Sequence, residues 1–138
     1  MTSEPNDPSG PNEARPVIAL VEDSKTIRFF VRMLLDDRFE IVEYETGPEA
    51  LAGMIASVPD LVLLDISLPE MDGTVVFQHA REDEALGKVP VIALTASDNP
   101  DDRDRYLAMG FDAFVSKPIV DETVLFGEID RLLGRPGM

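Results

Sequence analysis

The chain has 138 residues, which suits one ordinary domain, and 44% of them are apolar, enough for a hydrophobic core. It contains no cysteine, which excludes disulfide bonds and thiolate metal sites, and no apolar stretch is long enough to span a bilayer. Its 27 acidic and 12 basic residues give a formal charge of −15, which disfavours direct binding to the phosphate backbone of nucleic acids.

The first 16 residues contain four prolines and one glycine and show no apolar period, so we expect them to form a disordered tail. They also lack the basic and then apolar pattern of a secretion signal, and we expect a cytoplasmic protein. The folded domain is predicted over residues 17–134, with a short C-terminal tail at 135–138.

Short apolar runs predict five β-strands. The clearest is Asp60-Leu-Val-Leu-Leu-Asp65, whose four consecutive apolar residues are too few for a helix and do not alternate with polar ones. This pattern is typical of a strand that is buried on both faces of a parallel sheet. The predicted strands cover Val17–Val21, Glu40–Tyr44, Asp60–Asp65, Val89–Leu94 and Phe111–Ser116.

Five helices are predicted between and after these strands, from apolar residues at helical spacing and from capping residues. Ser24 or Asp23 is expected to cap the first helix, and Gly110 to end the fourth. We interpret the polar stretch Glu82–Gly87 as the tail of the third helix. The helices are predicted over about 27–35, 50–55, 73–81, 100–110 and 121–133. The apolar face of the first helix is predicted to comprise Ile27, Phe30, Val31, Leu34 and Leu35.

Strands that alternate with helices through short connections predict a single α/β domain of the doubly wound type. Its strands are expected to be parallel, joined by right-handed crossovers, with helices on both faces of the sheet. In such sheets, ligands bind at the carboxyl ends of the strands. Polar residues stand at four of these ends, namely Glu22 and Asp23, Asp65, Thr95, and Lys117.

Three carboxylates gathered at one edge of a sheet repel one another unless a cation lies between them. Oxygen ligands without nearby histidine or cysteine suit Mg²⁺. The metal, the Thr95 hydroxyl and the Lys117 ammonium would surround the Asp65 carboxylate with positive charge and hydrogen-bond donors. This arrangement indicates a site that accepts a phosphoryl group, whose negative charge needs neutralising as it arrives.

At these positions the sequence resembles the receiver domain of bacterial two-component response regulators, most of all the stand-alone chemotaxis or cell-cycle type. The matching segments are Val21-Glu22-Asp23-Ser24, Leu64-Asp65-Ile66-Ser67-Leu68-Pro69-Glu70-Met71-Asp72-Gly73, Ala93-Leu94-Thr95-Ala96 and Phe114-Val115-Ser116-Lys117-Pro118. The resemblance covers Val17 to about Leu133. It implies a flavodoxin-like (βα)5 fold with a five-stranded parallel sheet of order 2-1-3-4-5.

The resemblance also implies a chemistry for the acidic residues. Asp65 would be the phosphoacceptor, taking a phosphoryl group from a histidine kinase to form an acyl phosphate. Mg²⁺ would be bound by Asp23, Asp65 and the backbone carbonyl of Ser67, and Glu22 would hold metal-bound water. Glu22 stands where many members of the family have aspartate.

The remaining matched residues would bind or sense the phosphoryl group. Thr95 would hydrogen-bond a phosphoryl oxygen and move on activation, with Ala96 offering its backbone N–H. Lys117 would pair with the phosphoryl group as a point charge, and the Lys117-Pro118 bond would be cis. Phe114 would be the aromatic switch residue that turns inward when Thr95 moves.

The output of such a protein is expected to be protein binding or phosphorelay transfer, and it is not expected to be an enzyme. The expected partners are a sensor histidine kinase, a histidine phosphotransfer protein, and a target that docks on the face formed by the fourth helix, the fifth strand and the fifth helix. We expect a monomer or a weak homodimer, without membrane contact. The cognate kinase, the pathway and the choice between docking and relay stay open.

Two other classes of protein remain as alternatives. A degenerate receiver would act as a docking module without phosphorylation, but its usual sign, loss of acceptor or metal ligands, is missing here. A Mg²⁺-dependent aspartyl-phosphate hydrolase would also use an aspartate at a strand end. It would usually have a second acid two residues later, where this chain has Ser67.

Some residues are interpreted as having no functional role. His79 is expected to be an ordinary surface histidine. Met33, Met54, Met71 and Met109 are expected to pack in the interior rather than to line a groove for a partner.

Overall fold

The computed structural model describes residues 15–96, 99–119 and 121–134. The tails predicted at 1–16 and 135–138 lie outside these residues, except for Arg15 and Pro16. The carbonyl of Pro16 accepts a hydrogen bond from the backbone N–H of Glu40 at 3.0 Å, so the contacts of the domain begin just ahead of its first strand. Within the described part of the chain, no helix combines the length and apolarity that a membrane crossing requires.

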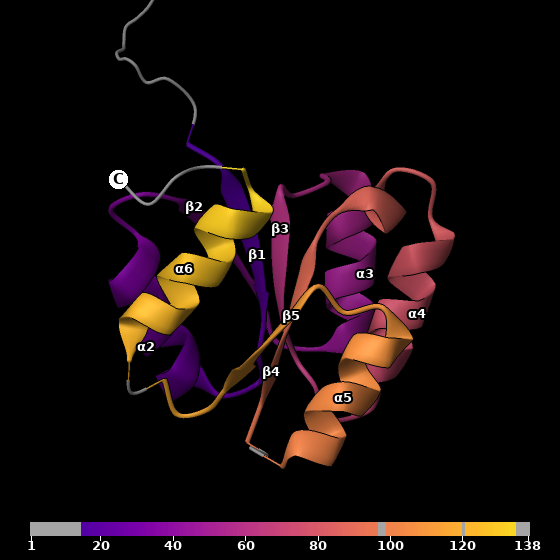
Figure 1. The fold of residues 1–138 in the computed structure, drawn as a ribbon. Helices are drawn as coiled ribbons and strands as arrows, with labels where there is room; N and C mark the ends of the chain where they lie inside the picture. The colour runs from indigo at the N-terminus through magenta and orange to yellow at the C-terminus, as the bar shows by residue number, and fades with distance from the viewer. Residues whose placement is uncertain (1–14, 97–98, 120, 135–138) are drawn as a thin grey trace, which may run out of the picture.

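Five parallel strands form one sheet in the order β2-β1-β3-β4-β5, as the resemblance implied (Figure 1). The strands are β1 (Val17–Val21), β2 (Glu40–Tyr44), β3 (Leu61–Asp65), β4 (Val91–Thr95) and β5 (Ala113–Ser116). All five residues of β3 and all five of β4 are buried, which explains why these central strands read as unbroken apolar runs.

Five helices connect the strands and follow the last one. They are α2 (Lys25–Leu35), α3 (Gly47–Ala56), α4 (Gly73–Glu82), α5 (Pro100–Met109) and α6 (Glu122–Leu132). Side-chain caps begin each helix where the sequence offers Ser, Thr, Asp or Asn, and Ser24 rather than Asp23 caps α2 by accepting from Ile27 N–H. Gly110 ends α5 as predicted, with a φ of 114° that favours glycine.

The sheet separates two hydrophobic cores, and successive residues of each central strand point into opposite ones. In β3, for example, Val62 and Leu64 face one core while Leu61 and Leu63 face the other. Helices α3, α4 and α5 cover the first core, and α2 and α6 cover the second (Figure 1). This arrangement confirms the doubly wound α/β fold with helices on both faces.

The polar stretch after α4 differs from its prediction as a helical tail. Helix α4 ends at Glu82, and a separate 3₁₀ turn at Leu86–Lys88 follows, with the Leu86 side chain 1% exposed. The Asp83 carboxylate accepts a hydrogen bond from Leu86 N–H at 2.8 Å and thereby starts the turn. The prediction was wrong because one buried leucine among acidic residues gives no periodic signal.

The core-facing side of α2 also differs from the prediction. The buried residues of this helix are Arg28, Val31 and Leu35, whereas Phe30 is 44% exposed. Met33 is 64% exposed, so its prediction as an interior packing residue was wrong. The buried stripe follows the spacing 28, 31 and 35, and the sequence pattern did not reveal it because a charged residue occupies its first position.

Candidate functional site

The four strand ends named from the sequence meet at one edge of the sheet. In the parallel register, Val21 of β1 lies beside Leu64 of β3, so the acidic pair that follows β1 lies next to Asp65. Thr95 lies beside Ser116 at the ends of β4 and β5, which places Lys117 just past the end of β5. The Lys117 backbone N–H donates to the Thr95 carbonyl at 2.7 Å and holds the two ends together.

Lys117 reaches across the edge of the sheet to two buried carboxylates. Its Nζ lies 3.0 Å from Asp65 Oδ1 and 3.1 Å from Glu22 Oε1. Both carboxylates are almost wholly buried, and the lysine side chain is only 12% exposed. Because charged groups lose hydration when buried, this close pairing is what allows the three charges to coexist.

Backbone N–H groups hold the two buried carboxylates in place. Asp65 Oδ1 accepts from Ser67 N–H at 3.0 Å, and Glu22 Oε2 accepts from Ser24 N–H at 3.1 Å. Each carboxylate therefore folds back on the loop that follows its own strand. The acidic side chains are fixed in direction before any ligand arrives.

Carboxylate oxygens of Glu22, Asp23 and Asp65 all lie within 4.8 Å of one another. Asp23 is exposed, whereas the other two are buried. A cluster of oxygen donors that is open to solvent on one side fits Mg²⁺, which keeps several water ligands and binds to one or two carboxylates. The Glu22 side chain faces Lys117 rather than solvent.

Burial raises the pKa of both Asp65 and Glu22, and it outweighs the opposing effects of Lys117 and of the Ser67 and Ser24 N–H groups. For Lys117, burial alone would lower the pKa, but hydrogen bonding and charge attraction to Asp65 and Glu22 outweigh it and raise the pKa. In the folded protein, burial therefore disfavours the charged form of both carboxylates, a cost that a bound cation would reduce.

Replacing Asp65 by asparagine is expected to raise the melting temperature in Mg²⁺-free buffer at pH 7 by a few degrees. The raised pKa means that the folded wild type loses stability as pH rises from the ordinary aspartate pKa, about 3.9, through the raised value. Asparagine does not ionise, so the gain should grow with pH over that window and disappear below it. Thermal melts of both proteins from pH 3.5 to 8 test this, and an equal gain at all pH values would contradict it.

A family model described as the response regulator receiver domain matches residues 18–129, most of the chain and all of the sites described above. The chain belongs to the response regulator receiver family. Receivers of this family take part in two-component signalling, and their acidic pocket binds Mg²⁺.

Individual relatives agree with this assignment. The polar-differentiation response regulator DivK of Brucella ovis is 36% identical over 103 residues, covering 74% of this chain and 84% of DivK. The response regulator PleD of Caulobacter vibrioides is 34% identical over 116 residues, or 83% of this chain. The chain spans only about a quarter of the length of PleD.

One similar solved structure is a receiver domain that contains a magnesium ion. The receiver domain of the sensor histidine kinase PA1611 from Pseudomonas aeruginosa superposes with a TM-score of 0.80 and 28% identity, covering 88% of this chain and 99% of that domain. That structure has a magnesium ion coordinated in its active site cleft.

The structure also gives the positions of the residues that were predicted to bind or sense the phosphoryl group. Thr95 is 4% exposed at the end of β4, and Ala96 follows it as an exposed residue. The Lys117-Pro118 peptide bond is cis. Phe114 is partly buried against the first core, with its ring 6.1 Å from that of Tyr106 and 6.0 Å from the Arg103 guanidinium. Phe114 thus lies on the other side of β5 from the second core.

One residue at the site was not identified from the sequence. Arg28 of α2 is 8% exposed, and its guanidinium donates to the backbone carbonyls of Glu22 and Asp23 at 2.8 and 3.1 Å. An available signal was the position of this arginine, one helical turn after the Ser24 cap and in line with Val31 and Leu35. A charged residue on a buried stripe indicates a specific partner.

Proposed function

We propose that the receiver accepts a phosphoryl group on Asp65 in a Mg²⁺-dependent reaction and signals by protein binding or by relay to a histidine-containing protein. The observation that supports this most directly is the buried Asp65 carboxylate with Lys117 Nζ at 3.0 Å and two further carboxylates close by. A nucleophile, a cation that can neutralise arriving charge and a set of metal ligands thus meet at one point.

In the proposed phosphoryl transfer, each residue of the site would have a distinct role. An Asp65 oxygen attacks phosphorus and forms an acyl phosphate, while the bond from phosphorus to the donor nitrogen breaks and the electron pair leaves with the imidazole. Lys117 transfers its attraction from the carboxylate to the new phosphoryl oxygens. The Thr95 hydroxyl and the Ala96 N–H, at the end of β4, donate to those oxygens.

Mg²⁺ bound by Asp23, Asp65 and the Ser67 carbonyl would neutralise charge on the phosphoryl oxygens during transfer. Glu22 is held by Lys117 and by Ser24 N–H, and from this position it would accept a hydrogen bond from a water on the metal. The proposed donors are a sensor histidine kinase and a histidine phosphotransfer protein. The structure of PA1611, in which magnesium lies in the active site cleft, supports the choice of metal.

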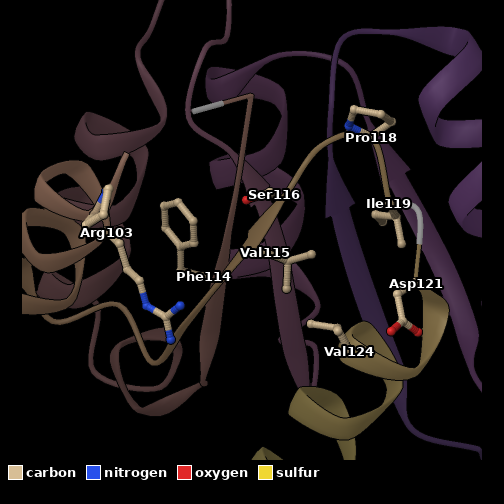
Figure 2. Close-up of a pocket in the computed structure, with 9 residues that line it drawn as sticks. Arg103, Phe114, Val115, Ser116, Pro118, Ile119, Asp121 and Val124 are labelled. Atoms are coloured by element: carbon tan, nitrogen blue, oxygen red, sulfur yellow. The ribbon is translucent and has the colours of Figure 1, made fainter. Parts of the chain in front are cut away.

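The proposed output surface is a groove between α5 and α6 (Figure 2). It has a volume of about 440 Å³ and is lined by Pro100, Arg103, Phe114, Val115, Ser116, Pro118, Ile119, Asp121 and Val124. Val124 is 50% exposed, and Phe114 lies in the wall of the groove close to the Arg103 side chain. Movement of Thr95 and Phe114 on phosphorylation would reshape this groove and bias a pre-existing equilibrium between binding states.

The deciding experiment is incubation with acetyl phosphate and Mg²⁺, followed by intact mass measurement, for the wild type and Asp65→Asn. We expect one adduct of about 80 Da in the wild type, one phosphoryl group as in the transfer scheme. It should be lost when Mg²⁺ is chelated and absent from the variant. No adduct on a folded wild type would favour a docking module that works without phosphorylation. Rapid turnover of assorted phosphate esters would favour the hydrolase.

A further inference from the structure

Arg28 joins the acidic loop to the second strand. Its Nη1 donates to the backbone carbonyls of Glu22 and Asp23. Its Nε donates to Oε1 of Glu43, a residue of β2, at 3.0 Å. A further carboxylate, that of Glu45, lies 3.6 Å from its Nη2. The guanidinium is buried, and a buried charge with this many partners has a fixed position and holds its partners in turn.

The Asp23 side chain depends on its backbone for direction. Among the described residues, no hydrogen bond or ion pair to the Asp23 carboxylate is found, and this side chain is exposed. Its neighbour Glu22 is held differently, by Ser24 N–H and Lys117 on the side chain and by a backbone N–H bond to the Tyr44 carbonyl. The contact from Arg28 to the Asp23 carbonyl therefore fixes the backbone from which the proposed metal ligand projects.

We propose that Arg28 is a positioning residue for Mg²⁺, which sets the affinity of the Glu22–Asp23–Asp65 cluster by holding the carbonyls of the acidic pair. The inference rests on the proposed function, in that the cluster must bind Mg²⁺. Residues that orient metal ligands without touching the metal usually change its affinity by about 10–100-fold when they are replaced.

Arg32 offers a matched control in the same helix. It lies one turn after Arg28 and pairs with the same carboxylate, with Nε 2.6 Å from Glu43 Oε2. Its other contacts are to the Ile41 carbonyl and to Asp36, both away from the acidic loop. Loss of this arginine removes a comparable ion pair from Glu43 but leaves the carbonyls of the acidic pair untouched.

The test compares Arg28→Lys with Arg32→Lys, because both substitutions keep the positive charge and remove the forked donor geometry. Mg²⁺ dissociation constants are measured by isothermal titration calorimetry, and amide shifts of Asp23 and Ser24 are followed by NMR during the same titration. We expect about tenfold weaker Mg²⁺ binding in Arg28→Lys and a change of less than about twofold in Arg32→Lys. A purely structural role would lower the melting temperature of both variants without this difference in affinity.

A second variant keeps the test decisive. Arg28→Gln removes a positive charge near the cluster. Because this charge repels Mg²⁺, its loss by itself would strengthen cation binding. Weaker Mg²⁺ binding in a folded Arg28→Gln protein would therefore support lost positioning directly. Unchanged affinity in both Arg28 variants, or equal weakening in Arg32→Lys, would overturn the inference. A wild type that binds no Mg²⁺ would overturn the proposed metal site itself, and this inference with it.

Discussion

Gly73→Ala is expected to lower the free energy of unfolding by about 3 kcal/mol and to abolish the proposed phosphorylation of Asp65. A Cβ at position 73 would collide with the backbone carbonyl of Asp65 and would lie 2.7 Å from the Cα of Ile66. These are backbone atoms of Asp65, the proposed acceptor, and of Ile66, so they cannot rotate away as a side chain would. Gly73 N–H also donates to the Ile66 carbonyl at 2.8 Å, which holds this close approach in place.

Gly127→Ala is the matched control for this substitution. Gly127 lies in α6, and apart from its chain neighbours and the backbone of its own helix, no atom of the described residues lies within 4 Å of the position that a Cβ would take. Alanine there should raise stability by about 0.5–1 kcal/mol, because glycine is the weaker helix former. Urea denaturation of both variants and the acetyl phosphate assay measure the contrast. Equal stabilities for the two variants would contradict the prediction, because they would show that the backbone at Asp65 and Ile66 moves at little cost to accommodate a Cβ.

Lys117→Met is expected to destabilise the Mg²⁺-free protein by about 3 kcal/mol at pH 7, because it leaves two buried carboxylates without their shared cation. The raised pKa of Lys117 means that its contribution is fully present below the ordinary lysine pKa of about 10.4 and is lost as pH rises from there through the raised value. Phosphoryl transfer from acetyl phosphate should also fall by about 100-fold, because a preorganised cation at the acceptor is lost.

The size of the Lys117 effect should depend on what else neutralises the carboxylates. Lowering the pH through the raised pKa values of Asp65 and Glu22 should narrow the difference between variant and wild type, and so should adding Mg²⁺. Lys88→Met is the control, since Lys88 is exposed in the 3₁₀ turn. Urea titrations at several pH values check both statements. A Lys117→Met protein as stable as Lys88→Met at pH 7 would mean that solvent, rather than Lys117, balances the two acids.

The site could be located from the sequence because the carboxyl ends of parallel strands all lie at the same edge of the sheet. Each of these strands ends at a polar residue or just before one, and parallel pairing places the ends that carry Asp65, Glu22 and Lys117 at one edge of the sheet. The strand order is different in kind, since nothing in the apolar periods distinguishes 2-1-3-4-5 from other orders. That order came from the resemblance to receivers, and the structure confirms it.

The interpretations that failed depended on contacts between side chains and distant backbone. Arg28 is buried because the carbonyls of the acidic pair and Glu43 surround it, and Phe30 and Met33 turn outward on the same helix. A prediction from the apolar pattern uses residue type alone. It therefore places the charged Arg28 outside and the apolar Phe30 and Met33 inside, the reverse of what the structure shows. Leu86 was overlooked for the same reason, because the carboxylate of Asp83 creates the turn that buries it.

The division of the interior into two cores has a mechanical consequence for the proposed output groove. Helix α5 packs in the core that contains Tyr106, and α6 packs in the other core through Leu125 and Ile129. The groove lies where these two layers meet over the edge strand β5. Among the described residues, neither core contains side chains of both α5 and α6, so a small shear of one helix past the other would leave the buried contacts of each in place. A partner bound in the groove would therefore bridge the two layers and resist that shear.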